Sequence, residues 1–195
     1  FDDRLTVRSI LKGTRTDDRF TPGGVLGAAS AFAPTQPVFT ESGSFFQWAD
    51  PLGTDNPVAE LELISDRAES YRSIGKLEGE YRLPFIDELS ATVRGGYDVT
   101  RAERISFTPS TLPSQLTSGG TFTRDTPTQL NTVFDAFLNH KRGFGPSNSD
   151  LDLTAGYSYE ESRNEFPFYE AQELSSDLLG PNGLPAAGIQ RSTLF

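Results

Sequence analysis

The chain has 195 residues, which suits one ordinary domain, and its formal charge is 17 − 27 = −10. No window approaches about 18 consecutive apolar residues, which excludes a transmembrane helix. The absence of cysteine excludes disulfides and thiolate metal sites. An acidic balance without a cluster of lysine and arginine argues against nucleic acid as a partner, because its phosphates would be repelled.

The chain starts with Phe1, and methionine occurs nowhere in it. It also lacks the features that are typical of a secretion signal, namely a positively charged start followed by an apolar core. We therefore expect a processed product or an internal fragment of a longer protein.

Side chains that alternate with a period of two predict a first β-strand near residues 4–13 and a hairpin from residues 70–83 and 89–102. Successive side chains leave a strand on opposite faces, so each strand of the hairpin has one apolar and small face. On its first strand this face consists of Tyr71, Ser73, Gly75, Leu77, Gly79, Tyr81 and Leu83. The opposite face, nearly all charged, consists of Arg72, Ile74, Lys76, Glu78, Glu80 and Arg82.

The second strand of the hairpin repeats this division. Its apolar face consists of Leu89, Ala91, Val93, Gly95, Tyr97 and Val99, and its other face includes Arg94 and Asp98. A further hairpin is predicted from residues 129–140 and 150–161, with Leu130, Phe134 and Leu138 on the apolar face of its first strand.

The connections between the predicted strands alternate in length. Short turns are expected at 84–88 and 141–149, and long loops near 16–66, 105–127 and 163–195. Long loops are uncommon in compact soluble domains, whereas outer-membrane barrels combine short periplasmic turns with long extracellular loops. The predicted fold is therefore an all-β antiparallel meander of about five long strands, part of a larger transmembrane β-barrel with long extracellular loops.

Tyrosines near the strand ends fit the aromatic girdles of such a barrel. Tyr71 and Tyr81 lie near opposite ends of one strand, and Tyr97 and Tyr159 lie near the outer ends of two others. The sequence thus predicts that the apolar face contacts lipid and the charged face lines a hydrated lumen.

Five short motifs, in this order, carry a family resemblance. Residues 55–62 read Asp-Asn-Pro-Val-Ala-Glu-Leu-Glu, and they are followed by the motifs at 71–75, 89–98, 107–110 and 150–161. Together they resemble the barrel of the SusC/RagA class of TonB-dependent outer-membrane transporters. The resemblance implies a section of a transporter that imports an oligosaccharide, a peptide or a similar bulky nutrient across the bacterial outer membrane.

The same resemblance implies the partners of the intact protein. These are the remainder of the barrel and its plug, a SusD-like surface lipoprotein, TonB and outer-membrane lipid. The resemblance implies no catalytic residue, no metal and no cofactor. Five strands cannot close a bacterial barrel, which uses an even number of at least about eight, so the chain alone is not expected to transport.

Candidate substrate-binding residues lie in the acidic segment 16–66, where the aromatic side chains Phe45, Phe46 and Trp48 occur. Aromatic side chains in a long surface loop are able to stack on sugar rings or contact a partner. The alternative is that they form the small core of the loop itself, as in other compact loops.

The other polar residues are weaker candidates for a catalytic or ligand-binding site. His140, the single histidine, has no histidine partners for a triad or a metal site and is expected at the apolar face near the end of its strand. Adjacent carboxylates at 17–18 and 160–161 would point to opposite faces of a strand. Residues 50–56 offer oxygen ligands but lack EF-hand spacing, and residues 23–27 lack a P-loop signature, so we expect a turn and a loop.

A second hypothesis is a soluble or secreted all-β ligand-binding module whose sheets pack on each other. Such a sandwich needs large interdigitating residues on its inner face. The apolar face here instead contains Gly75, Gly79, Ala91 and Gly95, which favours a wall that contacts lipid.

Overall fold

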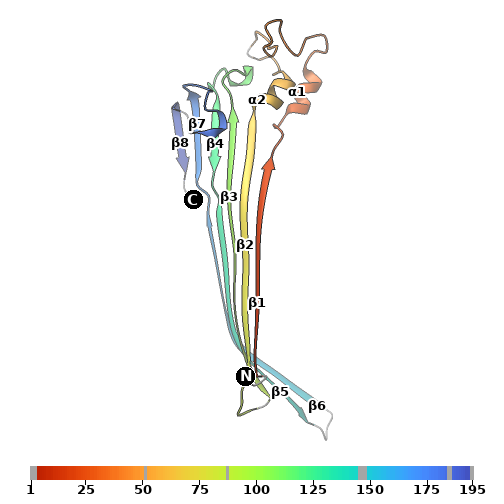
Figure 1. The fold of residues 1–195 in the computed structure, drawn as a ribbon, viewed down its shortest axis with the longest axis vertical. Helices are drawn as coiled ribbons and strands as arrows, with labels where there is room; N and C mark the ends of the chain where they lie inside the picture. Colours follow the sequence, from red (N-terminus) through yellow and green to blue (C-terminus); the bar gives the residue numbers. More distant parts are fainter. Residues whose placement is uncertain (1–3, 51, 87, 145–148, 184–185, 194–195) are drawn as a thin grey trace. The chain divides into compact units, whose positions relative to one another are not determined.

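The computed structural model describes residues 4–50, 52–86, 88–144, 149–183 and 186–193, which form a single eight-stranded sheet and short helices (Figure 1). The elements in chain order are β1 (Leu5–Arg19), α1 (Val25–Ala31), α2 (Pro57–Leu63), β2 (Ser65–Arg82), β3 (Leu89–Thr108), the 3-10 helix η1 (Pro113–Gln115), β4 (Thr121–Asp125), β5 (Thr128–Phe144), β6 (Ser149–Glu165), β7 (Phe168–Leu174), η2 (Gly180–Asn182) and β8 (Ala187–Thr193). Neither α-helix in these ranges is long or apolar enough to span a membrane.

The chain divides into two compact units. The strand unit comprises residues 1–15, 71–101 and 128–164, and the connection unit comprises residues 16–70, 102–127 and 165–195. The turn between β2 and β3 belongs to the strand unit. The three longer connections, between β1 and β2, β3 and β4, and β7 and β8, belong to the connection unit.

The strands form a meander. Along the sheet the order is β1-β2-β3-β4-β7-β8, and β5 pairs with β3 and β6. The two partners of β3 are antiparallel and bind different parts of it, since β5 pairs from Leu89 to Arg101 and β4 pairs from Arg104 to Thr108. The predicted fold class, an antiparallel meander with about five long strands, is confirmed.

Two prolines mark the interruptions between β4 and β5 and between β6 and β7. Proline has no backbone N–H to donate to a ladder. At these points the Ala102 N–H donates to Pro127 O and the Thr126 N–H donates to Pro167 O, both at 3.0 Å. The prolines therefore end the regular strands but still accept hydrogen bonds from the neighbouring chain.

The segments predicted as long loops contain more regular structure than expected. β1 continues to Arg19, β3 continues to Thr108, and the segments 105–127 and 163–195 hold β4, β7 and β8; residues 184–185 and 194–195 of the last segment lie outside the described part. Where a strand extends beyond the part of the sheet that has an apolar face, backbone hydrogen bonds to its neighbours hold it, and its side chains need not alternate between apolar and polar. The period-two signal that predicts a strand therefore weakens there.

The segment 16–66 also holds both α-helices, which the all-β prediction missed. Asn56 caps α2, because its Oδ1 accepts from the Val58 and Ala59 N–H groups at 3.0 and 3.4 Å, and Pro57 occupies the first turn. Asparagine followed by proline is a helix-start signal that the sequence contained. The glycine-rich run 23–27 was wrongly predicted as a loop, because α1 begins within it at Val25.

The connection unit has a small core of its own. Phe107 of β3, Phe122 of β4 and Ala171 of β7 are buried together, and the Phe122 and Tyr169 ring centres are 6.2 Å apart. Leu112, beside η1, is fully buried. Because β4 pairs with both β3 and β7, these side chains meet across three neighbouring strands.

Candidate transport surface

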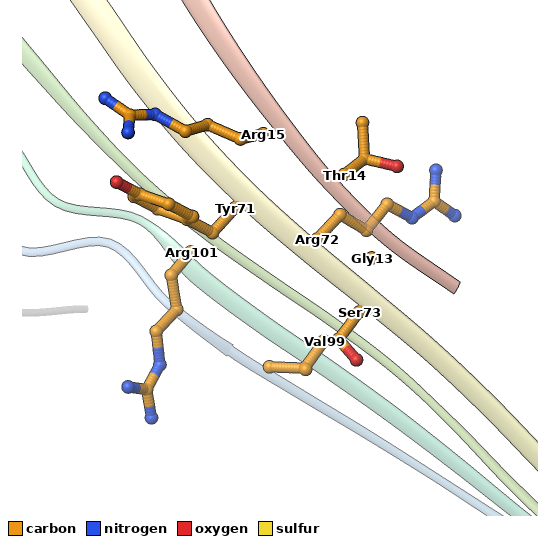
Figure 2. Close-up of a pocket in the computed structure, with 8 residues that line it drawn as sticks. All are labelled: Gly13, Thr14, Arg15, Tyr71, Arg72, Ser73, Val99 and Arg101. Carbon is orange, nitrogen blue, oxygen red and sulfur yellow. The ribbon is translucent and has the colours of Figure 1, made fainter. Parts of the chain in front are cut away.

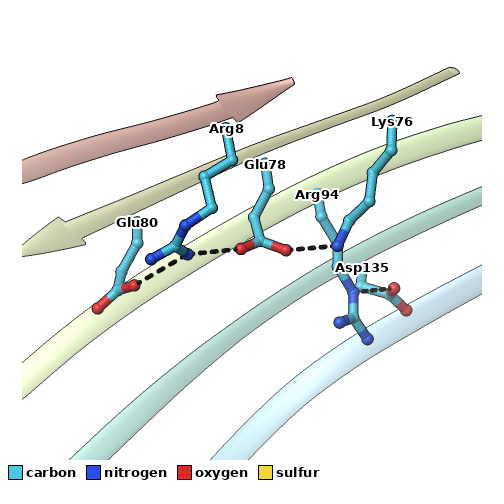
Figure 3. Close-up of polar contacts among 6 residues, drawn as sticks. All are labelled: Arg8, Lys76, Glu78, Glu80, Arg94 and Asp135. Atoms are coloured by element: carbon cyan, nitrogen blue, oxygen red, sulfur yellow. Dashed lines mark hydrogen bonds and ion pairs between the residues drawn. The ribbon is translucent and has the colours of Figure 1, made fainter. Parts of the chain in front are cut away.

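One face of the strand unit carries charged side chains that pair between strands (Figure 3). Arg8 of β1 places Nη1 2.9 Å from Glu78 Oε1 of β2 and 3.8 Å from Glu80 Oε2. The other oxygen of Glu78 lies 2.7 Å from Lys76 Nζ. Glu78 is therefore held between two cations, one from its own strand and one from the neighbouring strand.

The same face continues onto β3, β5 and β6. Arg94 Nε lies 2.6 Å from Asp135 Oδ2, and the Ser158 hydroxyl donates to Asp135 Oδ1 at 2.6 Å. The Arg94 guanidinium also lies over the Phe137 ring, 5.6 Å from its centre. Only 14% of the Asp135 side chain is exposed, so these partners enclose most of the carboxylate.

Further polar contacts extend this charged face along the strands. Arg72 binds Asp98 through two nitrogens, at 2.9 and 2.5 Å, which is the bidentate geometry that guanidinium and carboxylate favour. Asn139 donates to Asp152 at 2.6 Å and to Thr154 at 2.8 Å. The side chains predicted to share one face from alternation alone are thus joined by contacts on that face.

The opposite face is apolar and exposed. In the register of β3 and β5, Val93 lies across from Ala136 and Gly95 across from Phe134, so the apolar faces predicted for the two strands coincide. Leu77 is 59% exposed and Val93 50% exposed. No second layer covers these side chains within the described residues, as the inner face of a sandwich would require.

Near one end of the strands of the strand unit, the apolar face also carries charged residues. Figure 2 shows Arg15, Tyr71 and Arg101 extending to one side of the sheet, whereas Thr14 and Arg72 extend to the other. They line a cavity of about 530 Å³ together with Gly13, Ser73 and Val99. The Arg15 guanidinium lies 5.5 Å from the centre of the Tyr71 ring.

A larger hollow of about 710 Å³ borders Gly96 of β3. Lys76, Asp98, Asn131 and Glu160 are among its lining residues, so it presents both signs of charge and an amide. The alternation of each strand assigns these four side chains to the charged face.

The predicted substrate-binding aromatics lie in the connection unit and contact other aromatic rings. The Phe46 and Trp48 ring centres are 5.4 Å apart, and each lies 6.1 Å from that of Phe32. Phe45 stacks on Phe39 at 5.1 Å. Each of the three candidates is partly exposed, so part of each ring remains accessible.

A buried asparagine fixes the backbone that carries these rings. Asn56 is 1% exposed, and its Nδ2 donates to Val38 O at 2.8 Å and to Phe46 O at 3.1 Å. The same side chain caps α2 through Oδ1. Asn56 therefore connects the aromatic segment to the helix, a role that its position in the sequence did not reveal.

The polar segment 50–56 forms a turn and a cap, apart from Pro51, which lies outside the described residues. Asp50 Oδ1 accepts from the Leu52 N–H at 2.9 Å, and Asp55 Oδ1 accepts from the Ser114 N–H at 3.0 Å. Burial is the main cause that raises the pKa of nearby Glu60 in α2, and Asp55 adds to it. Among the described residues no histidine, aspartate and glutamate side chains gather as a metal site. His140 pairs with Leu89 near one end of β3.

The strand unit thus presents an antiparallel sheet with one charged and one apolar face, the arrangement of a β-barrel wall. No protein-family model matches it. The chain is 25% identical over 194 residues to the TonB-dependent receptor SusC of Bacteroides thetaiotaomicron, and the match covers 85% of this chain and 18% of SusC.

Solved structures agree with this similarity. A structure of the RagAB peptide transporter matches all of the chain, with a TM-score of 0.68 and 13% identity, over 23% of the matched chain. The RagAB peptide importer in its closed-closed state matches with a TM-score of 0.67. The chain therefore spans about a fifth of the length of these proteins, between 18% and 23%. The resemblance to SusC/RagA-like TonB-dependent transporters is confirmed, and the fold is that of a section of their barrel.

Proposed function

We propose that this chain is part of the barrel wall of a TonB-dependent transporter in a bacterial outer membrane. The observation that carries the proposal is the division of one sheet into two faces. Every ion pair described above in the strand unit lies on one face, and the exposed leucine, valine and tyrosine side chains of the hairpin lie on the other. A charged inner face suits a hydrated lumen, and the apolar face suits lipid.

The dimensions of the apolar face support this placement. Tyr81 lies ten positions after Tyr71 on β2, which corresponds to about 33 Å along a strand. In a barrel whose strands tilt by about 40° this length covers about 25 Å of membrane normal, the height of the apolar band of outer-membrane barrels. The outward residues of β2 between the two tyrosines carry no charge.

The nutrient imported by the intact protein is a peptide, an oligosaccharide or a similarly bulky molecule. Similarity to SusC and to the RagAB peptide transporter supports this class. The hollow beside Gly96 offers cationic, anionic and amide groups on the proposed lumen wall. The partly exposed rings of Phe45, Phe46 and Trp48 belong to a long connection, where they would contact the nutrient as it enters.

The same similarity supports the partners. The intact protein would combine the remaining barrel and an internal plug with a SusD-like surface lipoprotein, and it would draw energy through TonB. The long connections would then face outward, because barrels place long loops outside the cell and short turns in the periplasm. On this placement the connection unit meets the nutrient and the lipoprotein.

Cysteine labelling tests the two faces directly in a full-length protein whose cysteines outside residues 1–195, where present, are replaced by serine; residues 1–195 contain no cysteine. Leu77→Cys and Glu78→Cys place a thiol on adjacent residues of β2. We expect a membrane-impermeant maleimide to label Glu78→Cys in intact cells with a permeable outer membrane, and Leu77→Cys to react only after detergent is added. Equal labelling of both residues in the intact membrane would reject the proposed orientation.

Uptake by whole cells tests transport. Cells that carry the gene should accumulate a fluorescent oligopeptide or oligosaccharide, and cells that lack the gene or TonB should not.

The alternative hypothesis, a soluble binding module, is tested by the behaviour of the isolated chain. A monomer of residues 1–195 that needs no detergent and unfolds cooperatively would support a soluble binding module.

A further inference from the structure

The hollow beside Gly96, on the charged face of the strand unit, has an apolar floor. Gly96 of β3 pairs with Val133 of β5, and Ile74 of β2 lines the hollow with them. A side chain on Gly96 would occupy this space, since a Cβ atom built there lies 3.1 Å from Val133 Cγ1. Val133 is 37% exposed. The missing side chain thus leaves apolar surface uncovered between charged neighbours.

The polar groups that line the hollow differ in whether they already have partners. Lys76 and Asp98 are each held in an ion pair with another side chain of the same face, Lys76 as Figure 3 shows. Glu160 of β6 and Asn131 of β5 line the same hollow, and no side chain among the described residues binds either of them. The hollow therefore offers one carboxylate and one carboxamide to a ligand.

We propose that this hollow binds a lysine or arginine side chain of a peptide nutrient. This inference rests on the proposed function, because it requires that the charged face lines the lumen. Lysine and arginine bury an aliphatic stem against apolar surface while the charged end stays among polar groups. The stem would contact Ile74 and Val133. The cation would then donate to the Glu160 carboxylate and to the amide oxygen of Asn131.

The dimensions and lining of the hollow suit such a ligand. Its volume is about 710 Å³, and ligand pockets commonly measure about 300 to 1,000 Å³. Such pockets combine apolar walls with a few polar groups that fix the orientation of the ligand. Here Gly96 and Val133 supply the apolar part, and Glu160 supplies the free charge. The sign of that charge selects a cation.

The hollow lies near the outer end of the proposed lumen. Gly96 precedes Tyr97 and Glu160 follows Tyr159, and the two tyrosines were assigned above to the outer ends of their strands. Adjacent residues of a strand lie at the same level but on opposite faces. A nutrient that enters from outside would therefore meet the hollow early on its path.

The distribution of charge along the chain also favours a cationic nutrient. The strand unit contains 12 lysines and arginines and 12 aspartates and glutamates, so the formal charge of −10 lies entirely in the connection unit. A field of one sign raises the local concentration of ligands of the opposite sign and speeds their association. A basic peptide would gain from this attraction, whereas a neutral oligosaccharide would not.

Binding of matched peptides to the purified full-length protein in detergent tests the site. The probe is a fluorescent pentapeptide of four alanines with a central lysine, and it is compared with peptides that carry norleucine or glutamate at the centre. Norleucine keeps an aliphatic stem but has no charge. We expect the lysine peptide to bind about five-fold more tightly than the norleucine peptide, and the glutamate peptide to bind most weakly.

Substitutions of Glu160 separate the charge from the shape of the hollow. Glu160→Gln should remove the preference for lysine over norleucine, and Glu160→Lys should make the glutamate peptide bind more tightly than the lysine peptide. The matched control is Asp152→Asn, which removes the same charge from the same face of β6. Asp152 contacts Asn139 and Lys141 and does not line the hollow, so this variant should keep the preference.

Gly96→Ala tests the apolar floor. The new methyl group would occupy the space in which the aliphatic stem lies, because the added Cβ atom approaches Val133. We expect this variant to weaken the lysine and norleucine peptides by the same factor and to leave their ratio unchanged. Unaltered binding of both peptides to a correctly folded Gly96→Ala protein would overturn the site.

The other outcomes distinguish this site from the proposed function. Equal loss of preference in Glu160→Gln and Asp152→Asn, or no preference in the native protein, would overturn the site. Failure of a maleimide to label Glu160→Cys in the otherwise cysteine-free protein without peptide would also overturn it, because another segment would then fill the hollow. A protein that imports an oligosaccharide but binds none of the peptides would lose only this site. Absence of the protein from the outer-membrane fraction would refute the proposed function itself.

Discussion

The ring of Tyr97 covers Gly75. The two residues lie on neighbouring strands, β3 and β2, and a Cβ atom built on Gly75 would lie 2.2 Å from Tyr97 Cε1. The Tyr97 hydroxyl and the Ser73 hydroxyl are 3.1 Å apart, within hydrogen-bond distance, which holds the ring along β2. An aromatic ring that fills the space above a glycine is a known way to fix the register of neighbouring strands.

This contact predicts the effect of Gly75→Ala. The new methyl group would displace the Tyr97 ring and break its contact with Ser73, at a cost of about 1 to 3 kcal/mol in the free energy of unfolding. Gly79→Ala is the matched control on the same strand, because an added Cβ there meets nothing within 4 Å. Urea unfolding of the full-length protein in detergent measures both. Equal stability of the two variants would contradict the close contact.

The membrane placement predicts a difference between Leu77→Arg and Ile74→Arg. Both changes replace an aliphatic residue of β2 by arginine, but Leu77 is on the apolar face and Ile74 on the charged face. Leu77→Arg should make the free energy of barrel folding less favourable by about 2 to 4 kcal/mol, and Ile74→Arg by much less. Heat-modifiable migration of the full-length protein after outer-membrane isolation checks this. Similar assembly of both variants would reject the assignment of faces.

The Arg94 and Asp135 pair predicts how salt acts on the charged face. In a double-mutant cycle with Arg94→Gln and Asp135→Asn, we expect a measurable favourable coupling at low salt. At 1 M salt the Debye length is about 3 Å, so a hydrated pair should lose much of this coupling. Unfolding of the four proteins at both salt concentrations gives the two values. Coupling that is identical at both concentrations would show that the face is not hydrated.

Glu60 predicts a pH dependence in α2. Burial raises its pKa above the ordinary 4.5, and Glu60 Oε2 is buried without a hydrogen-bond partner among the described residues. Because the folded-state pKa is the higher one, the stabilisation is complete below pH 4.5 and is lost as the pH rises through the raised value. Glu60→Gln should therefore slow hydrogen exchange of residues 57–63 at pH 7 relative to the native protein.

The control for this prediction is the same comparison below pH 4.5, where the native Glu60 is protonated as well. There the two proteins should exchange alike. Glu62→Gln, at an exposed position of the same helix, should leave the exchange unchanged at both pH values. Faster exchange of Glu60→Gln at pH 7 would mean that the ionised carboxylate stabilises α2.

The sequence by itself determined the long strands, the turn between β2 and β3 and the two faces of the sheet. Alternation of side chains is a local property, and the charged face from Arg72 to Arg82 could be read without knowledge of any partner strand. The order of short motifs likewise sufficed for the resemblance to the SusC/RagA class. Each of these inferences needed only neighbours along the chain.

The tertiary structure alone decided which side chains meet. Arg94 pairs with Asp135, 41 residues away, because the register of β3 and β5 places them opposite each other. The same dependence on distant neighbours explains β4, β7 and β8, which are too short and polar to show a clear period but are held by adjacent strands. The cavity between Arg15 and Arg101 also exists only because three strands that are far apart in the sequence lie next to one another.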